Sequence, residues 1–390
     1  MNYRTNSING DEISQLGFGC MRFPRNIEKT TELVKSAVER GVNYFDTAYI
    51  YSGSEQALGT ALKNTGLRDK VKIATKLPLF SAKKKEDIER LFNTSLERLA
   101  TDRIDYYLLH MLSDIPTFER LKGLGILEWI AEKKRSGKVI NIGFSFHGER
   151  NNFVKLMDAY DWDFCQIQYN YCDENNQAGR FGLEYAVKKG VPVIAMSPLR
   201  GGTLSNTLAE SAKVHFTKSN PSRSLTDWSL RWIWDQQEIL TVLSGMSDMA
   251  QLDENIELAS AISAGVITPE ERKVYTQVLE SLKNSREIPC TGCGYCLPCP
   301  QGVNIPDCLF CYNEAQSGSY FDAIKQYLMA TGAITTTQSY ASKCNGCRAC
   351  EKRCPQAIEI SKELPKVARK IESFWFRPAF ALARKVIGVR

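Results

Sequence analysis

The sequence lacks the features that would place it in a membrane or a secretory pathway. Across its 390 residues, no apolar run reaches the roughly 18 residues that a bilayer-spanning helix needs. The amino-terminal stretch MNYRTNSINGDEIS is polar and has no apolar core of the kind found in signal peptides. We therefore expect a cytoplasmic protein without a transmembrane segment, in a compartment where thiols stay reduced.

Cysteine, by contrast, is abundant. The chain has thirteen cysteines, ten of them between Cys290 and Cys354. The other three, Cys20, Cys165 and Cys172, are scattered. Clustered cysteines in a reducing compartment indicate metal ligands before disulfides.

Most of the chain alternates short apolar strands with helical patterns. The expected strands are Ile13–Gly19, Asn43–Asp46, Val71–Thr75, Ile104–Leu109, Val139–Gly143, Phe164–Gln168, Val191–Ala195 and Ile239–Leu243. The expected helices are Lys29–Glu39, Ser54–Lys63, Lys85–Leu99, Glu119–Arg135, Glu149–Ala159, Arg180–Lys188, Ser222–Trp234, Met249–Ser263 and Pro269–Lys283. Eight βα units in about 260 residues predict an α/β fold of the (β/α)8 TIM-barrel type, with an open doubly wound sheet as the rival. No G-x-G-x-x-G follows a strand, so no Rossmann fingerprint is present.

The pattern changes at about residue 286, where two cysteine runs flank a segment that predicts two short helices. We expect three domains: a barrel over residues 1–285, a small helical ferredoxin-like iron–sulfur domain over 286–365, and a basic amphipathic tail over 366–390.

The two cysteine runs, CTGCGYCLPCP and CNGCRACEKRCP, carry the strongest metal-binding signal. The second matches the C-x2-C-x2-C-x3-C-P run of two-cluster ferredoxins, in which the fourth cysteine ligates the other cluster. The first is one residue shorter before its fourth cysteine, which makes Cys299 the least certain ligand. We predict two [4Fe–4S] clusters, one held by Cys290, Cys293, Cys296 and Cys354 and the other by Cys344, Cys347, Cys350 and Cys299. Zinc is the alternative metal.

Two further observations belong to this region. Cys308 and Cys311 form another CxxC pair, which is either a pair of buried helix residues or an additional ligand or redox pair. Residues 343–390 carry a net charge of +8, against +6 for the whole chain. Because a thiolate-bound cluster is anionic, it accounts for nearby basic residues, and we expect no nucleic-acid partner.

Four reactive side chains follow adjacent expected strands. Asp46 ends the second strand, Tyr51 lies in the loop after it, Lys76 ends the third strand and His110 follows the fourth. Catalytic residues of such barrels lie at the carboxyl ends of the strands. A nearby ammonium stabilises a phenolate and lowers the pKa of a tyrosine, and an imidazole can hydrogen-bond a carbonyl oxygen. Together they fit proton transfer to a carbonyl.

The stretches NYFDTAYIYSGSEQALGTALK, IATK and DYYLLH resemble the aldo-keto reductase family over roughly residues 10–265. The resemblance implies a catalytic tetrad of Tyr51 as general acid/base, Lys76 and Asp46 as its modulators, and His110 as the residue that orients the substrate carbonyl. It also implies a nicotinamide dinucleotide across the barrel mouth. With the cysteine runs included, the chain resembles a subgroup with a carboxyl-terminal ferredoxin-like domain.

The cofactor contacts that the resemblance implies match less completely. They are Gly19, Cys20, Met21 and Asp46 near the nicotinamide; Ser145 and Gln166 at its carboxamide; Met196 at the stacking position; Ser197, Leu199, Arg200 and Gly201 near the pyrophosphate; and Gly245, Ser247, Gln251, Glu254 and Asn255 at the adenosine end. Phe146 replaces the usual Asn, Met196 replaces the usual aromatic, and the Lys/Arg pair for a 2′-phosphate is missing. NAD and NADP are therefore not distinguished. We expect Phe18, Phe23, Phe80, Met111, Phe146 and His147 to line an apolar pocket.

The resulting expectation is an iron–sulfur oxidoreductase that acts on a small carbonyl substrate. Clusters move single electrons and nicotinamides move hydrides, so the electron route stays open. Either NAD(P)H chemistry runs in the barrel beside structural or sensory clusters, or a flavin links the two, or the substrate is reduced in one-electron steps without nicotinamide. A redox partner protein is a further expected partner. The non-enzyme alternative is an electron-transfer or redox-sensing subunit whose barrel docks a partner.

Overall fold

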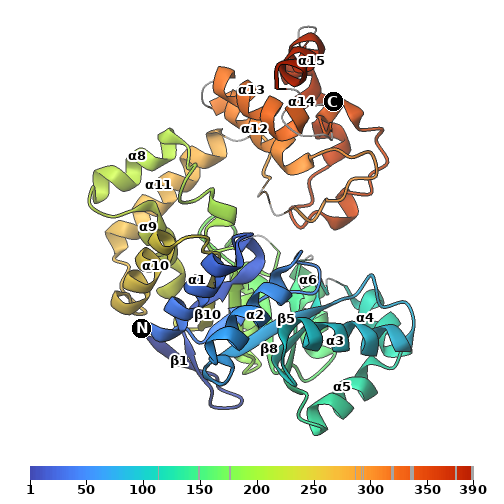
Figure 1. The fold of residues 1–390 in the computed structure, drawn as a ribbon. Helices are drawn as coiled ribbons and strands as arrows, with labels where there is room; N and C mark the ends of the chain where they lie inside the picture. The colour runs from blue at the N-terminus through green and yellow to red at the C-terminus, as the bar shows by residue number, and fades with distance from the viewer. Residues whose placement is uncertain are drawn as a thin grey trace. The chain divides into compact units, whose positions relative to one another are not determined.

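The computed structural model describes residues 1–112, 114–147, 150–174, 177–285, 287–290, 292, 294–317, 320–333, 338–373 and 376–387. The chain divides into two compact units (Figure 1). The first comprises Met1–Leu199 and Thr226–Thr268, and the second comprises Arg200–Leu225 and Pro269–Arg390.

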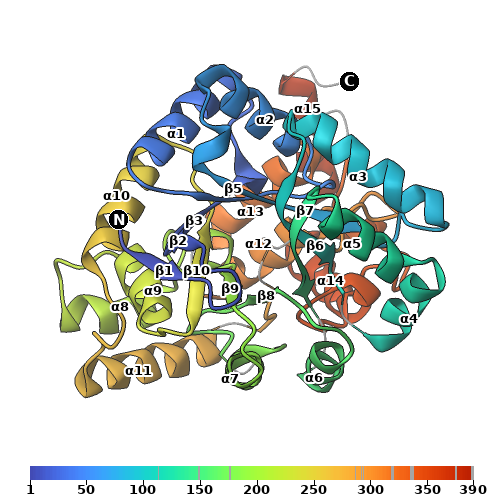
Figure 2. The ribbon, with the colours of Figure 1, turned by 90° about the horizontal axis from the view of Figure 1, so that it is seen from below.

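The first unit is a closed barrel of eight parallel strands in the order β10-β3-β4-β5-β6-β7-β8-β9 (Figure 2). The strands are β3 (Leu16–Gly19), β4 (Tyr44–Asp46), β5 (Lys72–Pro78), β6 (Ile104–His110), β7 (Val139–Phe146), β8 (Phe164–Gln168), β9 (Val193–Met196) and β10 (Ile239–Ser244). β9 also pairs with β10, which completes the closure. The predicted TIM barrel is therefore confirmed, and the open sheet is wrong.

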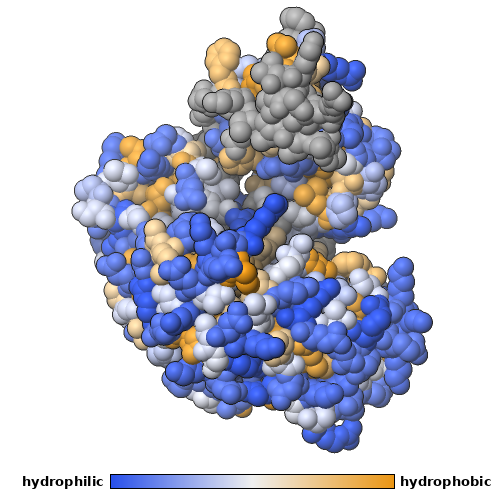
Figure 3. Space-filling model, viewed as in Figure 1, coloured by the Kyte–Doolittle hydropathy of each residue, from blue (hydrophilic) through white to orange (hydrophobic). Residues whose placement is uncertain are grey.

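The barrel strands read as continuous apolar runs because both of their faces are covered. All seven residues of β6 are buried, as expected for a parallel sheet enclosed by helices. A cluster of side chains fills the barrel interior, and it consists of Ile13, Tyr44, Ala74, Tyr106, Leu108, Phe164, Ile194, Met196, Leu240 and Leu243. In the space-filling view, hydrophilic side chains cover most of the visible face of the first unit and apolar ones are scattered (Figure 3).

The helices around the strands lie close to their expected positions (Figure 2). They are α1 (Ile27–Glu39), α2 (Ser54–Thr65), α3 (Lys85–Leu99), α4 (Ile115–Gly123), α5 (Ile126–Arg135), α6 (Arg150–Asp158), α7 (Gly179–Lys188), α9 (Leu225–Trp234) and α10 (Met249–Ala261). The start of one expected helix, Glu149, lies outside the described residues.

Two expectations were wrong in detail. The single strand expected at Ile13–Gly19 is split: β2 (Glu12–Ser14) pairs antiparallel with β1 (Tyr3–Thr5), and only β3 joins the barrel. The helix expected at Glu119–Arg135 is also two helices, because Gly125 between α4 and α5 has a φ of 80°. A left-handed residue cannot continue a right-handed helix.

The second unit has helices as its regular elements among the described residues, and it draws on two distant segments. α8 (Glu210–Ser219), which the sequence did not predict, packs against α11 (Pro269–Ser285) through the rings of Phe216 and Tyr275, whose centroids are 5.4 Å apart. His215 Nε2 lies 3.0 Å from Ser281 Oγ in the same pair. α11 therefore belongs to the second unit, although we expected the first domain to extend to residue 285.

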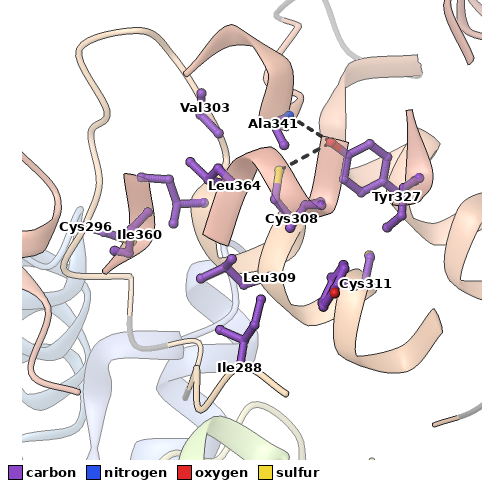
Figure 4. Packing of buried hydrophobic residues seen from close by; sticks show 14 of the residues in the cluster. Ile288, Cys296, Val303, Cys308, Leu309, Cys311, Tyr327, Ala341, Ile360 and Leu364 are labelled. Atoms are coloured by element: carbon purple, nitrogen blue, oxygen red, sulfur yellow. Dashed lines mark hydrogen bonds between the residues drawn. The ribbon is translucent and has the colours of Figure 1, made fainter. Parts of the chain in front are cut away.

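The carboxyl-terminal part contains α12 (Ile305–Ser317), α13 (Tyr320–Leu328), α14 (Ile360–Ile371) and α15 (Phe376–Ile387). Its core gathers Ile288, Val303, Leu309, Ile360 and Leu364 around the two buried cysteines of α12 (Figure 4). α14 crosses the expected boundary at residue 365, and Val367, Ile371, Phe376 and Phe380 pack into this same core. The expected tail is thus part of the core up to at least Phe380. That the three expected domains are independent folding units stays a prediction.

None of the described helices is both long and apolar enough to cross a bilayer.

Candidate active site

The four predicted tetrad residues come from neighbouring strands that end at one mouth of the barrel. Asp46 is the last residue of β4, Lys76 lies in β5, and His110 is the last residue of β6. Tyr51 lies in the loop between β4 and α2, where its N–H donates to the carbonyl of Ala48 over 3.0 Å. Because parallel strands end at the same side, the structure brings all four together.

Lys76 and Asp46 form a buried ion pair at the centre of this group. Lys76 Nζ donates to Asp46 Oδ1 and Oδ2 over 2.6 and 2.7 Å, and to the carbonyl of Thr47 over 2.7 Å. The lysine side chain is 1% exposed. Burial raises the pKa of Asp46, and the Lys76 ammonium partly offsets that rise. With three acceptors on Nζ, the ammonium is held in one position.

Tyr51 and His110 flank this pair. Lys76 Nζ lies 5.3 Å from the centroid of the Tyr51 ring, and the Tyr51 and His110 rings are 6.0 Å apart and nearly perpendicular. Burial lowers the pKa of His110 well below its ordinary value, and the charge of Lys76 lowers it further. His110 is therefore a neutral imidazole at pH 7.

Two polar side chains lie directly opposite each other on β7 and β8. Ser145 pairs with Gln166, and each is 1% exposed. Ser145 Oγ accepts from the Met111 N–H over 2.9 Å, which leaves its hydroxyl proton free to donate. Gln166 donates to Met196 Sδ over 3.4 Å, while its buried Oε1 finds no partner within the described part of the chain. A buried carbonyl without a donor is costly and suits a ligand that brings one.

The comparisons with known proteins agree with this geometry. The model of the Aldo/keto reductase family matches residues 15–268. The chain belongs to the aldo/keto reductase family. It is similar to the uncharacterized oxidoreductase YqkF of Bacillus subtilis, with 28% identity over 276 residues that cover 64% of this chain and 88% of that protein. L-galactose dehydrogenase of Arabidopsis thaliana is 27% identical over 314 residues, covering 70% of this chain and 93% of that protein.

Among solved structures, the aldo-keto reductase AKR11C1 from Bacillus halodurans, in its holo form, superposes with a TM-score of 0.59 at 25% identity. The match covers 71% of this chain and 96% of that one. The chain is therefore an oxidoreductase of the aldo-keto reductase type, a family named for the reduction of carbonyl compounds. Residues after 268 lie outside the family model.

The other residues expected to contact the nicotinamide also lie near the barrel mouth, at the end of β3 and in the loop after it. Gly19 lies against the backbone after β10, where an added Cβ would be 3.3 Å from the Ser244 carbonyl. Cys20 is fully buried, and Met21 is 51% exposed. Ser54 Oγ, at the start of α2, donates to the Cys20 carbonyl over 2.8 Å and so ties the loop after β3 to the loop that holds Tyr51.

The expected pyrophosphate residues do not all belong to one unit. Ser197 and Leu199 lie in the first unit after β9, whereas Arg200 and Gly201 begin a segment of the second unit. Ser197 has a φ of 59°, a strained conformation of the kind that occurs at functional loops. A shared phosphate site for these four residues stays a prediction.

The expected adenosine residues mostly make local contacts. Asn255 Nδ2 donates to Ser244 Oγ over 2.8 Å and is 3% exposed, so it holds the end of β10 in place. Gln251 Oε1 accepts from the Ser247 N–H over 3.0 Å. Gly245 follows β10 directly, and Glu254 lies in α10. These interactions position the loop; nucleotide binding by it stays a prediction.

Phe146 was wrongly expected to line the substrate pocket. Residues of a strand alternate between its two faces, and Phe146 shares a face with Phe144. Both rings pack against Phe153 of α6, with centroid distances of 5.1 and 5.9 Å. Phe146 therefore faces the helices. Phe18 is also fully buried, stacked 5.5 Å from Phe45.

Sequence reasoning missed two features of the mouth. The Thr47 carbonyl that accepts from Lys76 belongs to the backbone, so no residue type indicates it. Gln168 lies two residues after Gln166, on the same face of β8, and its Nε2 donates to Asp173 Oδ2 over 2.8 Å. Because side chains alternate between the two faces of a strand, the stretch QIQ could have predicted that Gln168 lies on the same face as Gln166.

The two cysteine runs repeat one backbone conformation. In each run the residue two positions after the first cysteine has a positive φ, 69° at Gly292 and 75° at Gly346. The residue four positions after it does too, 80° at Gly294 and 58° at Arg348. The N–H of Gly292 donates to Cys290 Sγ over 3.4 Å, and the N–H of Gly346 donates to Cys344 Sγ over 3.4 Å.

The cysteines group across the runs. Cys290, Cys296 and Cys354 line one small hollow that is partly open to solvent, together with apolar residues such as Ile305 and Leu309. In the other group, burial raises the pKa of Cys350 to about 11, and the nearby Cys344 and Cys299 thiols contribute to the rise.

Of the other two predicted ligands, Cys347 is exposed. Cys293 lies outside the described residues. As the side chains stand, no three metal-ligating groups among the described residues converge tightly on one point.

Cys308 and Cys311 are fully buried within α12. Cys308 Sγ lies 3.7 Å from the Tyr327 hydroxyl, which accepts from the Ala341 N–H over 2.8 Å and donates to Glu372 (Figure 4). Burial raises the pKa of both thiols, so they are protonated core residues.

Proposed function

We propose that the barrel catalyses the NAD(P)H-dependent reduction of a small carbonyl compound. One observation carries the proposal: a buried Lys76–Asp46 pair lies beside the Tyr51 ring, with a neutral His110 across from it. Family membership supports the same reaction class. The name of the Arabidopsis relative, a sugar dehydrogenase, supports chemistry between an alcohol and a carbonyl.

The protein's residues would divide the work as follows. Tyr51 donates a proton to the carbonyl oxygen, and the ammonium of Lys76 stabilises the phenolate that remains. Asp46 keeps Lys76 charged and oriented. His110, neutral at pH 7, donates a hydrogen bond to the same oxygen, where negative charge develops. A bound nicotinamide supplies the hydride.

The polar atoms on β7 and β8 fit a nicotinamide carboxamide. Gln166 Oε1 would accept from its NH2 group, and the Ser145 hydroxyl would donate to its oxygen. This fit favours nicotinamide over the flavin-linked and nicotinamide-free routes.

We further propose that the cysteine runs hold two [4Fe–4S] clusters with crossed ligands. Cys290, Cys293, Cys296 and Cys354 would hold one, and Cys344, Cys347, Cys350 and Cys299 the other. The repeated backbone conformation and the grouping of Cys354 with the first run and Cys299 with the second support this pairing. Bound clusters would supply one-electron chemistry.

The test begins with anaerobic purification and analysis of iron, sulfide and flavin, followed by titration with NADH and NADPH. We expect nicotinamide binding and carbonyl turnover in the wild type. Tyr51→Phe should lose at least a hundredfold in kcat while it keeps cofactor affinity. Tyr49→Phe is the matched control, because the Tyr49 ring packs 4.3 Å from the Arg98 guanidinium instead. Full activity in Tyr51→Phe would rule out the tetrad role, and tight flavin without nicotinamide binding would favour the flavin route.

A further inference from the structure

His147 continues the inward face of β7 beyond the end of the strand. Phe144 and Phe146 face α6, so Ser145 faces the barrel interior. By the same alternation, His147 lies on the side of Ser145, one step further toward the mouth. It is partly exposed, whereas His110 is only 4% exposed. A ligand that lies over His110 could therefore also reach His147.

The charges of the tetrad also act on the second imidazole. Burial lowers the pKa of His147 to about 4, and the Lys76 ammonium contributes to the fall. His147 in turn contributes to the lowered pKa of His110. Both imidazoles are therefore neutral at pH 7, and they offer hydrogen bonds without a positive charge.

A buried chain of polar side chains begins at Gln177, which lies beside the His147 imidazole. Gln177 Nε2 donates to Gln168 Oε1 over 3.3 Å. Gln168 and Asn170 each donate to Asp173 Oδ2 over 2.8 Å. These four supporting residues are between 0% and 8% exposed. Burying so many polar groups is tolerated only when they are bonded to one another, and such networks hold side chains rigidly.

The support includes a strained backbone. Gln177 has a φ of 53°, in the left-handed region that side chains other than glycine rarely adopt. Strain of this kind persists where surrounding contacts enforce it and is concentrated at binding sites. A histidine that only filled space in the core would need neither the relay nor the strain.

We propose that His147 is a specificity-determining residue that hydrogen-bonds a second, uncharged oxygen of the substrate, a hydroxyl or carbonyl near the carbonyl held by Tyr51 and His110. The inference rests on the proposed function and adds a substrate class to it. Lys76 is already engaged by Asp46 and Thr47, so the pair of imidazoles fits a hydroxy- or oxo-carbonyl compound better than a carboxylate.

Kinetics with 3-hydroxybutanone and butanone test this directly, because the two ketones differ by one hydroxyl. The wild type should favour 3-hydroxybutanone in kcat/KM, and His147→Leu should lower the ratio of the two kcat/KM values roughly tenfold. His147→Gln, which keeps a hydrogen-bonding group, should restore most of it. His215→Leu, in the second unit, is the matched control.

A binding measurement separates this inference from the proposed function. The chain has three histidines, His110, His147 and His215, so imidazole 15N spectra are simple to assign with the variants. Added 3-hydroxybutanone should shift the His147 signals, and butanone should not. Butanone turnover without any preference for the hydroxyketone and without a His147 shift would overturn the inference and leave the proposed function standing.

Two other results also decide against the inference. If His147→Leu weakens NADPH binding and slows both ketones equally, His147 contacts the cofactor instead. If the wild type reduces neither ketone and Tyr51→Phe changes no activity, the proposed function itself fails.

Discussion

At the scale of single residues, the site depends on a buried ion pair, in which the charge of Lys76 is compensated by that of Asp46. Lys76 and Asp46 are both at most 6% exposed at the side chain, so neither could be charged there alone at acceptable cost. The pair is thus a structural requirement of the barrel mouth as well as a proposed part of its chemistry.

Replacing one member of this pair should lower the free energy of unfolding more than replacing both. Lys76→Met leaves a buried carboxylate without its cation and should lower the free energy of unfolding by about 3–5 kcal/mol. The double variant Lys76→Met/Asp46→Asn should recover part of that loss. Urea unfolding measures both. Lys72→Met is the control, because the Lys72–Asp11 pair is closer to the surface, with the lysine 35% exposed, and should cost less than about 1 kcal/mol. Additive losses in the double variant would contradict the argument.

The two mouth imidazoles should make stability fall in mild acid. The unfolded chain protonates a histidine near pH 6.5, whereas folded His147 resists protonation until about pH 4 and His110 resists it as well. The unfolded state therefore binds more protons in this window. The stabilising contribution is complete above pH 6.5 and is lost as the pH falls toward 4, by no more than about 3 kcal/mol for His147. Urea midpoints measured between pH 4 and 7 should change less steeply in His147→Leu; an unchanged slope would refute this.

At the scale of elements, close packing between helices fixes several positions that propensity does not. Gly59 in α2 lies against the end of α3, where an added Cβ would be 2.4 Å from the Arg98 carbonyl oxygen and 2.6 Å from the Leu99 carbonyl carbon. This contact sets how closely α2, which begins after the Tyr51 loop, can approach α3.

We therefore expect Gly59→Ala to destabilise the barrel by about 1–3 kcal/mol, because backbone atoms must move. Gly123→Ala is the matched control: Gly123 is helical, and nothing lies within 4 Å of its added Cβ. It should be neutral or gain up to about 1 kcal/mol from helix propensity. Thermal unfolding of both variants checks the difference, and equal Tm values would show that α2 can shift freely.

At the scale of the whole molecule, the proposed clusters would join segments some 50 residues apart. Cys354 lies with the first cysteine run and Cys299 with the second, so each cluster would close a loop through the helical core formed by α12 and α14.

Crossed ligation predicts which cluster each variant loses. Cys354→Ser should remove the cluster of Cys290, Cys293 and Cys296, and Cys299→Ser should remove the other, with iron and sulfide falling by about half in each case. Electron paramagnetic resonance of the reduced protein should then show two different single-cluster spectra. Cys172→Ser, in the barrel, should change neither value. Identical spectra from the two ligand variants would exclude the crossed assignment, and zinc in place of iron would exclude the clusters.

Much of the fold could be predicted from the sequence because its signals are local. β8 and α3 have the bounds that the pattern of apolar residues predicts, and Asp46 and His110 end their strands. Lys76 was expected to end its strand but lies two residues before the end of β5. The order of eight βα units also determines that the strands are parallel. α8 was missed because only its packing against α11, about 60 residues later, identifies it as part of a core.

The sequence by itself determined the barrel, the positions of Asp46, Lys76 and His110 at or near the ends of their strands, and the two cysteine runs, because these depend on periodicity and spacing along the chain. Only the tertiary structure decided which atoms meet. In it, the Thr47 carbonyl accepts a hydrogen bond from Lys76, and the Phe146 ring packs against α6. Gln177 lies beside His147 and is connected through Gln168 to Asp173. Such contacts join residues from different loops, and their cost or benefit exists only once water has been removed from between them.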